Sequence, residues 1–72
     1  MTNEEKIALL EDMLELDENT LTPETELKSI AEYDSMAKLS LIVLSDDTFG
    51  KKLPGEIIRT FKYVKDILAF WE

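Results

Sequence analysis

The stretch Asp34–Gly50, DSMAKLSLIVLSDDTFG, decides the fold, because its secondary structure limits how the segments on either side can pack. Fourteen residues separate Ser35 from Gly50, and none of them is glycine or proline. The apolar run inside it would also suit a buried strand. Its length, an aspartate that can cap the first turn and the closing glycine favour a helix over residues 35–49. Because apolar residues occupy almost every side of this helix, we expect it to lie centrally.

The N-terminal segment TNEEKIALLEDMLEL predicts a helix over about residues 3–16. Thr2 and Glu5 have the spacing of a capping box, in which each side chain accepts a hydrogen bond from the other residue's backbone. Apolar residues recur at helical spacing and should be buried, namely Ile7, Leu10, Met13 and Leu14. The acidic residues between them should face solvent, namely Glu4, Glu11, Asp12 and Glu15.

Residues 17–33 lack a sustained helical period and contain Pro23, so we expect a long loop. Such a loop in a small domain is usually functional or held down by its own apolar residues. The residues expected to hold it against the core are Leu21, Leu27, Ile30 and Tyr33.

Two helices are expected after Gly50. The segment LPGEIIRTF places Pro54 where a short helix can begin, and Ile57, Ile58 and Phe61 would face inward. The segment YVKDILAFW predicts an amphipathic helix whose buried positions are Val64, Ile67, Leu68 and Trp71. The expected fold is therefore all-α, a single domain over residues 1–72 with three main helices and one short helix in a small four-helix bundle.

The composition excludes several classes of function. The 72 residues include no cysteine and no histidine, which excludes disulfides, thiolate nucleophiles, Ser-His-Asp triads and zinc sites with thiolate or imidazole ligands. The net charge of −8 argues against nucleic acid and favours partners with basic docking surfaces. No stretch is long and apolar enough to span a membrane, and we expect a cytoplasmic monomer that is not an enzyme.

The Asp-Ser-Met sequence at residues 34–36 gains weight from the segments around it. These segments are LTPETEL at 21–27, FG at 49–50, LP at 53–54 and YVKDIL at 63–68. In this order and spacing the chain resembles the acyl carrier proteins, small four-helix carriers whose Asp-Ser-Leu serine receives 4′-phosphopantetheine. The resemblance covers essentially all 72 residues.

The resemblance implies that Ser35 is converted from the apo to the holo form by a phosphopantetheinyl transferase, which uses coenzyme A and Mg²⁺. The thiol of the arm would then hold an acyl or aminoacyl group as a thioester. A loading ligase for that group and downstream transferases would be the other partners. Asp34 would help to place Mg²⁺ during modification without binding a metal stably. Met36 would belong to the apolar surface that partners contact.

The physical chemistry of a helix start agrees with this implication. A phosphodiester in the first turn lies near free N–H groups and the positive end of the helix dipole, which stabilise an anion by on the order of 0.5–1 kcal/mol. A plainer interpretation is that Asp34 and Ser35 only cap a helix. The protein would then be a non-catalytic acidic interaction module with a carrier fold and an unused serine, and Ser35→Ala would keep its biological activity.

Two further classes are excluded. The segment DENTLTPETEL lacks the glycine and the alternating oxygen ligands of an EF-hand loop. Helix-turn-helix DNA binding would need a basic recognition helix, which the sequence does not contain.

The resemblance also implies that short acyl chains are buried between the second and third helices. Candidate pocket residues are Leu39, Ile42, Ser45, Leu53, Ile58 and Phe61, although plain core packing explains the apolar ones equally well. The Ser45 hydroxyl would need a buried partner, most simply the carbonyl one turn back, and we expect it to border the cavity. The bulk of Ile58 and Phe61 suggests a short pocket.

The sequence departs from the family pattern in three places. Ala37, Lys38 and Ser40 form the expected partner-facing part of the helix, where many fatty-acid carriers have acidic residues. Met36 stands where the family motif has leucine. These two departures favour a specialised carrier with dedicated partners, loaded either with an acyl group or with an aminoacyl group. Tyr63 replaces a threonine that often caps the last helix, which costs about 1 kcal/mol unless Thr60 or solvent compensates.

Overall fold

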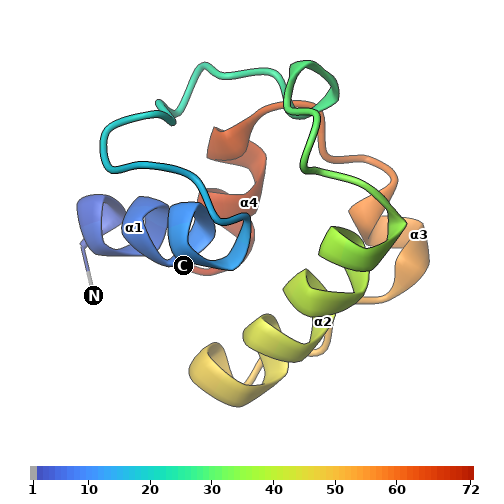
Figure 1. Ribbon diagram of the computed structural model, residues 1–72. Coiled ribbons are helices and arrows are strands. Elements are labelled where there is room, and N and C mark those ends of the chain that lie inside the picture. The colour runs from blue at the N-terminus through green and yellow to red at the C-terminus, as the bar shows by residue number, and fades with distance from the viewer. Residues whose placement is uncertain (1) are drawn as a thin grey trace.

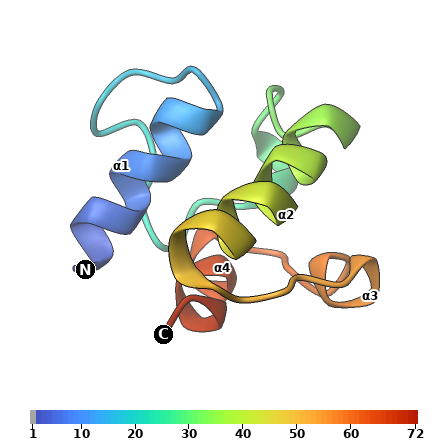
Figure 2. The same cartoon turned by 90° about the horizontal axis from the view of Figure 1, so that it is seen from below.

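The computed structural model describes residues 2–72. These residues contain four α-helices and one short 3-10 helix (Figures 1 and 2). Their bounds are α1 Asn3–Met13, η1 Leu27–Ser29, α2 Ser35–Phe49, α3 Gly55–Ile58 and α4 Val64–Phe70. The only β pairing within these residues is one isolated bridge between Glu26 and Tyr63. The expected all-α bundle of three main helices and one short helix is therefore confirmed, whereas η1 was not expected.

Helix α1 begins as the sequence predicts but ends earlier. The Thr2 Oγ1 atom accepts from the Glu5 N–H at 3.1 Å, and Glu5 Oε1 accepts from the Thr2 N–H at 2.9 Å. The Thr2 N–H also holds the pKa of the Glu5 carboxyl below its usual range. The helix stops because Glu15 has a φ of 58°, a left-handed conformation that closes a Schellman turn. In this turn the Leu16 N–H donates to the Glu11 carbonyl at 2.8 Å.

The expectation that Glu11 faces solvent is wrong. Its side chain is only 5% exposed, and Oε2 accepts from the N–H groups of Thr20 and Leu21 at 2.9 and 3.0 Å. A carboxylate that leaves water is stabilised when it accepts backbone hydrogen bonds of this kind. Glu11 thus anchors the beginning of the long loop to α1.

The loop between α1 and α2 is held at several points. Its residues Leu21, Leu27 and Ile30 are buried, as predicted, and Tyr33 packs against the core while partly exposed. The backbone of the loop also pairs with the entry to α4. The Leu27 N–H donates to the Lys62 carbonyl at 2.9 Å, the Val64 N–H to the Thr25 carbonyl at 3.0 Å, and the Lys65 N–H to the Pro23 carbonyl at 2.9 Å.

Helix α2 has the predicted ends but only one buried face. Asp34 caps it, because Oδ1 accepts from the Ala37 N–H at 3.0 Å, and Gly50 ends it with a φ of 63°. The buried residues recur four positions apart, at Ala37, Leu41 and Ser45. The expectation of a central helix is therefore wrong, because apolar residues on the other side of α2 stay largely exposed beside a hollow that separates α2 from α1. These are Met36, Leu39 and Val43, which are 71%, 58% and 57% exposed.

The C-terminal helices differ from expectation in the exposure of Ile57 and in the residue that accepts hydrogen bonds at the start of α4. Ile58 is buried and Phe61 is partly buried, but Ile57 is exposed, because the single turn of α3 turns only one of its isoleucines inward. At the start of α4, the missing threonine cap is replaced by Asp66, whose Oδ2 accepts from the N–H groups of Lys62 and Tyr63 at 2.8 and 3.0 Å. These two bonds hold the pKa of the Asp66 carboxyl below its usual range.

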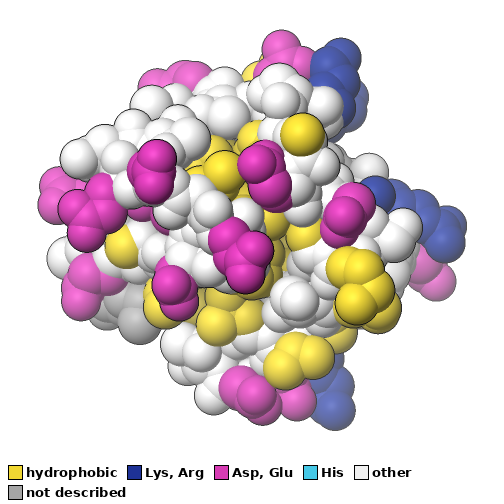
Figure 3. All heavy atoms as spheres, viewed as in Figure 1, with side chains coloured by type: hydrophobic (Ala, Val, Ile, Leu, Met, Phe, Trp, Pro, Cys, Tyr) yellow, Lys and Arg dark blue, Asp and Glu magenta, His cyan; other side chains and the backbone are white. Residues whose placement is uncertain are grey.

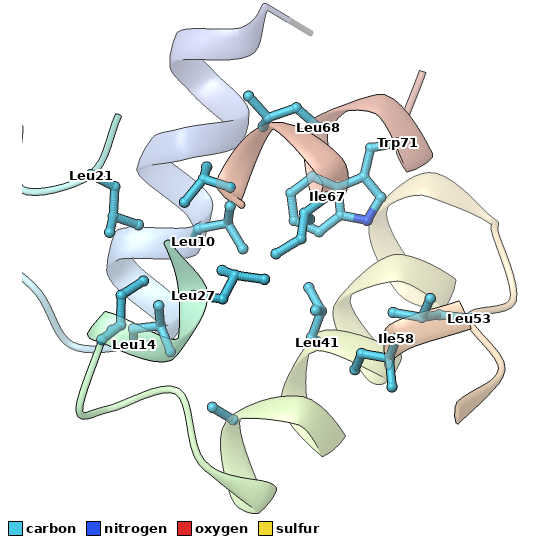
Figure 4. Close-up of a cluster of buried hydrophobic side chains, with 13 residues drawn as sticks. Leu10, Leu14, Leu21, Leu27, Leu41, Leu53, Ile58, Ile67, Leu68 and Trp71 are labelled. Carbon is cyan, nitrogen blue, oxygen red and sulfur yellow. The ribbon is translucent and has the colours of Figure 1, made fainter. Parts of the chain in front are cut away.

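The core lies where α1, α2, α4 and the loop converge. Figure 4 shows Leu10 from α1, Leu41 from α2, Ile67 from α4 and Leu27 from the loop directed toward a common centre. Trp71, just after α4, closes the cluster on the side of α2. None of the helices over residues 2–72 is long and apolar enough to cross a membrane.

Candidate attachment site at Ser35

Ser35 is the first residue of α2, and it is exposed to solvent. Because Asp34 provides the cap, the serine hydroxyl is not needed to satisfy the helix start. Within residues 2–72 no hydrogen bond of the Ser35 hydroxyl is recorded, nor any of the Ser35 and Met36 N–H groups. The position thus presents a free nucleophilic oxygen beside two free amide donors.

The surface next to Ser35 along α2 is apolar rather than acidic. Met36, Leu39 and Val43 join residues of α1 to line a hollow of about 490 Å³ between the two helices. Apolar side chains are visible in the depression between these helices in Figure 3. Of the residues expected to face partners, Lys38 and Ser40 are exposed, but Ala37 is buried against the core and cannot belong to that surface.

A second hollow, of about 700 Å³, opens on the other side of the helix start. Tyr33 and Lys38, which flank Ser35 in the sequence, both line it. The Lys38 Nζ lies 5.7 Å from the centre of the Tyr33 ring. The Tyr33 hydroxyl is buried without a hydrogen-bond partner in the described part of the chain, and burial raises its pKa. Sequence reasoning assigned Tyr33 only to packing and missed this hydroxyl.

Comparison with known proteins gives relatives of one kind. An acyl carrier protein of Myxococcus xanthus is 31% identical over 55 residues, which are 76% of this chain and 70% of that protein. An acyl carrier protein of Thermosynechococcus vestitus is 31% identical over 88% of this chain and 78% of its own length. The chain belongs to the acyl carrier protein family. Members of this family are carriers and not catalysts, which agrees with the expectation that the chain is not an enzyme.

A more specialised relative matches over a longer stretch. The meromycolate extension acyl carrier protein of Mycobacterium tuberculosis is 27% identical over 97% of this chain. The chain spans only 64% of the length of that relative. No model of a protein family matches the chain, and no solved structure matches it significantly.

The six predicted pocket residues of this carrier do not share one cavity. Ile58 and Phe61 line the hollow beside Tyr33. Ile42 and Leu53 line a separate hollow with Pro54, and Leu39 faces the hollow between α1 and α2. The grouping missed the fact that α2 borders different neighbours on its two flanks, α1 beside Leu39 and the segment before α3 beside Ile42.

Ser45 lies in the interior of the carrier, away from these hollows, and is fully buried. A carbonyl partner one turn back was expected, but within residues 2–72 the hydrogen bond found for the Ser45 hydroxyl is with Trp71, whose Nε1–H donates to Oγ at 2.8 Å. Trp71 also stacks on Phe49, with 4.4 Å between ring centres. A buried indole N–H usually finds an acceptor, and this one finds it across the interface between α2 and α4.

Proposed function

We propose that the protein carries an acyl or aminoacyl group as a thioester on a 4′-phosphopantetheine arm attached to Ser35. It would deliver this group to the enzymes of a specialised biosynthetic pathway. The observation that carries the proposal is the exposed Ser35 at the start of a 15-residue helix, with its hydroxyl left free because Asp34 makes the cap. The names of the relatives support a carrier role.

The residues around Ser35 fit a phosphate-linked arm. Two N–H groups without a recorded partner, those of Ser35 and Met36, and the positive end of α2 favour an anion at this position. The chain has no cysteine, so the thiol needed for a thioester would be supplied by the arm. Ser35 is exposed, and its surroundings leave room for a transferase to approach it.

Ser35 and Asp34 would have separate roles in the attachment of the arm. Ser35 Oγ would bond to the phosphorus of the pantetheine phosphate as that phosphorus loses its bond to the nucleotide part of coenzyme A. The hydroxyl proton would go to a base of the transferase, and adenosine 3′,5′-bisphosphate would leave. Asp34 would keep one carboxylate oxygen on the Ala37 N–H and offer the other to Mg²⁺, which prefers oxygen ligands.

The partners of the carrier would meet the apolar outer face of α2, defined by Met36, Leu39 and Val43. An exposed apolar patch of this kind commonly marks an interaction surface. We propose that a phosphopantetheinyl transferase, a loading ligase and downstream transferases use it in turn, and that the carrier acts as a cytoplasmic monomer.

The experiment incubates the apo protein with coenzyme A, Mg²⁺ and a promiscuous phosphopantetheinyl transferase, and measures the intact mass. The expected result is the gain of one phosphopantetheine per chain in the wild type and in the control Ser40→Ala, and no gain in Ser35→Ala. The proposal fails if the wild type gains no mass, or if Ser35→Ala gains as much as the wild type. Failure would favour the acidic interaction module with an unused serine.

A further inference from the structure

The hollow beside Tyr33 gathers positive charge in a protein that is strongly negative overall. Four of the chain's eight basic residues line it, namely Lys28, Lys38, Arg59 and Lys62, and all four are exposed. They come from η1, from α2 and from the segment between α3 and α4. The one acidic residue in the lining is Glu26. In Figure 3 most of the Lys and Arg side chains in view lie at the right-hand edge, whereas Asp and Glu spread over the left and the front.

Three of these cations lack a carboxylate partner. The only ion pair recorded among residues 2–72 joins Lys28 to Glu26 at 3.5 Å, which leaves Lys38, Arg59 and Lys62 without an acidic group of that part of the chain within 4.0 Å. Like charges that share a hollow repel one another, and the repulsion is relieved when negative charge binds between them. The rim of the hollow is therefore suited to contact with carboxylates from outside the chain.

The acidic residues are concentrated at the other end of the molecule. Seven of the 16 lie among residues 4–18, which contain one lysine and thus carry a net charge of −6. Helix α1, which bears most of them, lies on the opposite side of the molecule from α3 (Figures 1 and 2), and the molecule measures 26 × 25 × 19 Å. Because the Debye length is about 8 Å at physiological salt, the acidic end is largely screened at the hollow. The local positive charge decides what approaches this face.

The hollow combines its charged rim with an apolar interior. Ile58 is buried and Phe61 is partly buried, and both line the hollow together with the rings of Tyr33 and Tyr63. A fifth cation is close, because Lys65 Nζ lies 5.2 Å from the centre of the Tyr63 ring. An apolar centre with a polar, exposed rim is the usual anatomy of a protein–protein interface, whereas a small-molecule site encloses most of its ligand. The exposed cations thus favour a protein over a free anion.

We propose that the hollow beside Tyr33 is a docking surface for an acidic segment of a partner protein. Carboxylates of that segment contact Lys38, Arg59 and Lys62, while an apolar side chain between them enters the hollow against Ile58 and Phe61. The net charge of −8 by itself predicts a basic partner surface, so this face would meet a partner of the opposite kind. The proposal rests on the proposed function only in taking the partner to be an enzyme that the carrier serves.

The test titrates three synthetic pentapeptides with blocked ends into the ¹⁵N-labelled apo protein. Peptide EEFEE provides carboxylates and an apolar side chain, EEGEE provides the carboxylates alone, and KKFKK has the opposite charge. The readout is the set of backbone amide shifts. Because the arm is absent, the outcome does not depend on whether Ser35 accepts phosphopantetheine, and failure of attachment would count against the proposed function alone.

EEFEE should bind saturably and move the amides of Lys28, Tyr33, Lys38 and Arg59. EEGEE should bind about tenfold more weakly, because it has no side chain to bury in the hollow. KKFKK should instead move amides among residues 11–19, at the acidic end of the molecule. Raising the salt concentration from about 0.02 to 0.3 M should weaken the binding of EEFEE, because the contacts with exposed cations are screened.

Matched variants separate the hollow from the overall charge. Lys62→Gln should weaken EEFEE binding about threefold, and Arg59→Gln/Lys62→Gln about tenfold, because each exposed charge pair contributes only modestly. The control Lys52→Gln makes the same change in net charge as Lys62→Gln at an exposed position outside this hollow, and it should bind EEFEE like the wild type. The ¹⁵N spectrum of each variant without peptide establishes that it is folded.

The proposal is overturned if EEFEE moves none of the amides around the hollow, or if KKFKK moves them as much as EEFEE does. It is also overturned if Lys52→Gln weakens binding as much as Lys62→Gln, because the effect would then come from net charge alone. Inorganic pyrophosphate is a fourth probe. If it saturates the same amides at a lower concentration than EEFEE, the hollow is a site for a free phosphate compound and the docking proposal fails.

Discussion

The hydrogen bond between Ser45 and Trp71 predicts a large effect from a small substitution. Ser45→Ala removes the only hydrogen-bond partner that the Trp71 indole N–H has within residues 2–72. Trp71 is 3% exposed, and Ser45 is 0% exposed. A buried donor left without an acceptor costs about 1–3 kcal/mol. The higher helix propensity of alanine offsets roughly 0.5 kcal/mol of this cost. We therefore expect the free energy of unfolding to fall by about 0.5–2.5 kcal/mol.

The measurement is urea unfolding of the apo protein at pH 7, followed by far-ultraviolet circular dichroism. With a slope of about 1 kcal/mol per M for so small a chain, the midpoint should fall by about 0.5–2.5 M while the slope stays the same. The control is Ser40→Ala, on the exposed side of the same helix, which should stay within about 0.5 kcal/mol of the wild type.

A double-mutant cycle separates the hydrogen bond from other effects of the substitution. Trp71→Phe removes the donor, and the cycle with Ser45→Ala should give a coupling free energy of about 1 kcal/mol. The reasoning is refuted if Ser45→Ala unfolds at the wild-type urea concentration or above it, or if the cycle gives no coupling. Ser45 would then be better regarded as a residue near the cargo than as a buried link between α2 and α4.

Three further predictions concern helix ends. Asp34→Asn should keep the cap, so its free energy of unfolding should stay within about 0.5 kcal/mol of the wild type. If the second carboxylate oxygen of Asp34 contacts Mg²⁺, the variant should accept phosphopantetheine more slowly in a time course followed by intact mass. Equal rates for variant and wild type would exclude that role. Glu15→Gly should raise the urea midpoint by a stabilisation of about 0.5–1 kcal/mol, because Glu15 has a φ of 58°, and a lower midpoint would contradict this. The pKa of Asp66 is lower folded than unfolded because it accepts from Lys62 and Tyr63, so its contribution to stability is present above the usual aspartate range and is lost as the pH falls through the folded pKa. Urea titrations from pH 6 to pH 2 should accordingly show a shallower acid loss in Asp66→Asn than in the wild type, whereas parallel curves would refute the assignment.

Helix starts and the glycine stop could be predicted because their signals are local. The Thr2 and Glu5 pair, the Asp34 cap and the Gly50 stop each depend on residues within one turn. The end of α1 could not be predicted, because it depends on a left-handed Glu15, and glutamate carries no preference for that conformation.

Errors about burial arose where the partner is distant in the sequence. Glu11 was assigned to solvent because its acceptor role appears only when the loop brings the Thr20 and Leu21 amides to it. Ser45 was given a local carbonyl, whereas its partner lies 26 residues away, at Trp71. Short-range periodicity contains no information about either contact.

At the candidate site, too, features that depend on neighbouring residues could be predicted, and features that depend on distant residues could not. The exposure of Ser35 and the cap at Asp34 follow from neighbouring residues and could be anticipated. The hollow beside Tyr33 could not, because its basic residues Lys28, Lys38, Arg59 and Lys62 are scattered over 35 positions of a chain that is acidic on average. Only the packing of η1 and the start of α2 beside the segment before α4 brings them together.

The backbone pairing of the loop with the entry to α4 has a consequence for the order of folding. Its three hydrogen bonds join residues 35 to 42 positions apart, whereas each helix closes its bonds over four residues. Closing so long a loop lowers the entropy of the chain before the three hydrogen bonds can stabilise it. We therefore expect this pairing to form late in folding. During synthesis, the residues of α2 and its cap are joined to the chain before residues 62–65 exist. The approach to Ser35 is therefore fixed only when the last part of the chain has been made, and a chain that stops before residue 62 would have the serine without its fixed surroundings.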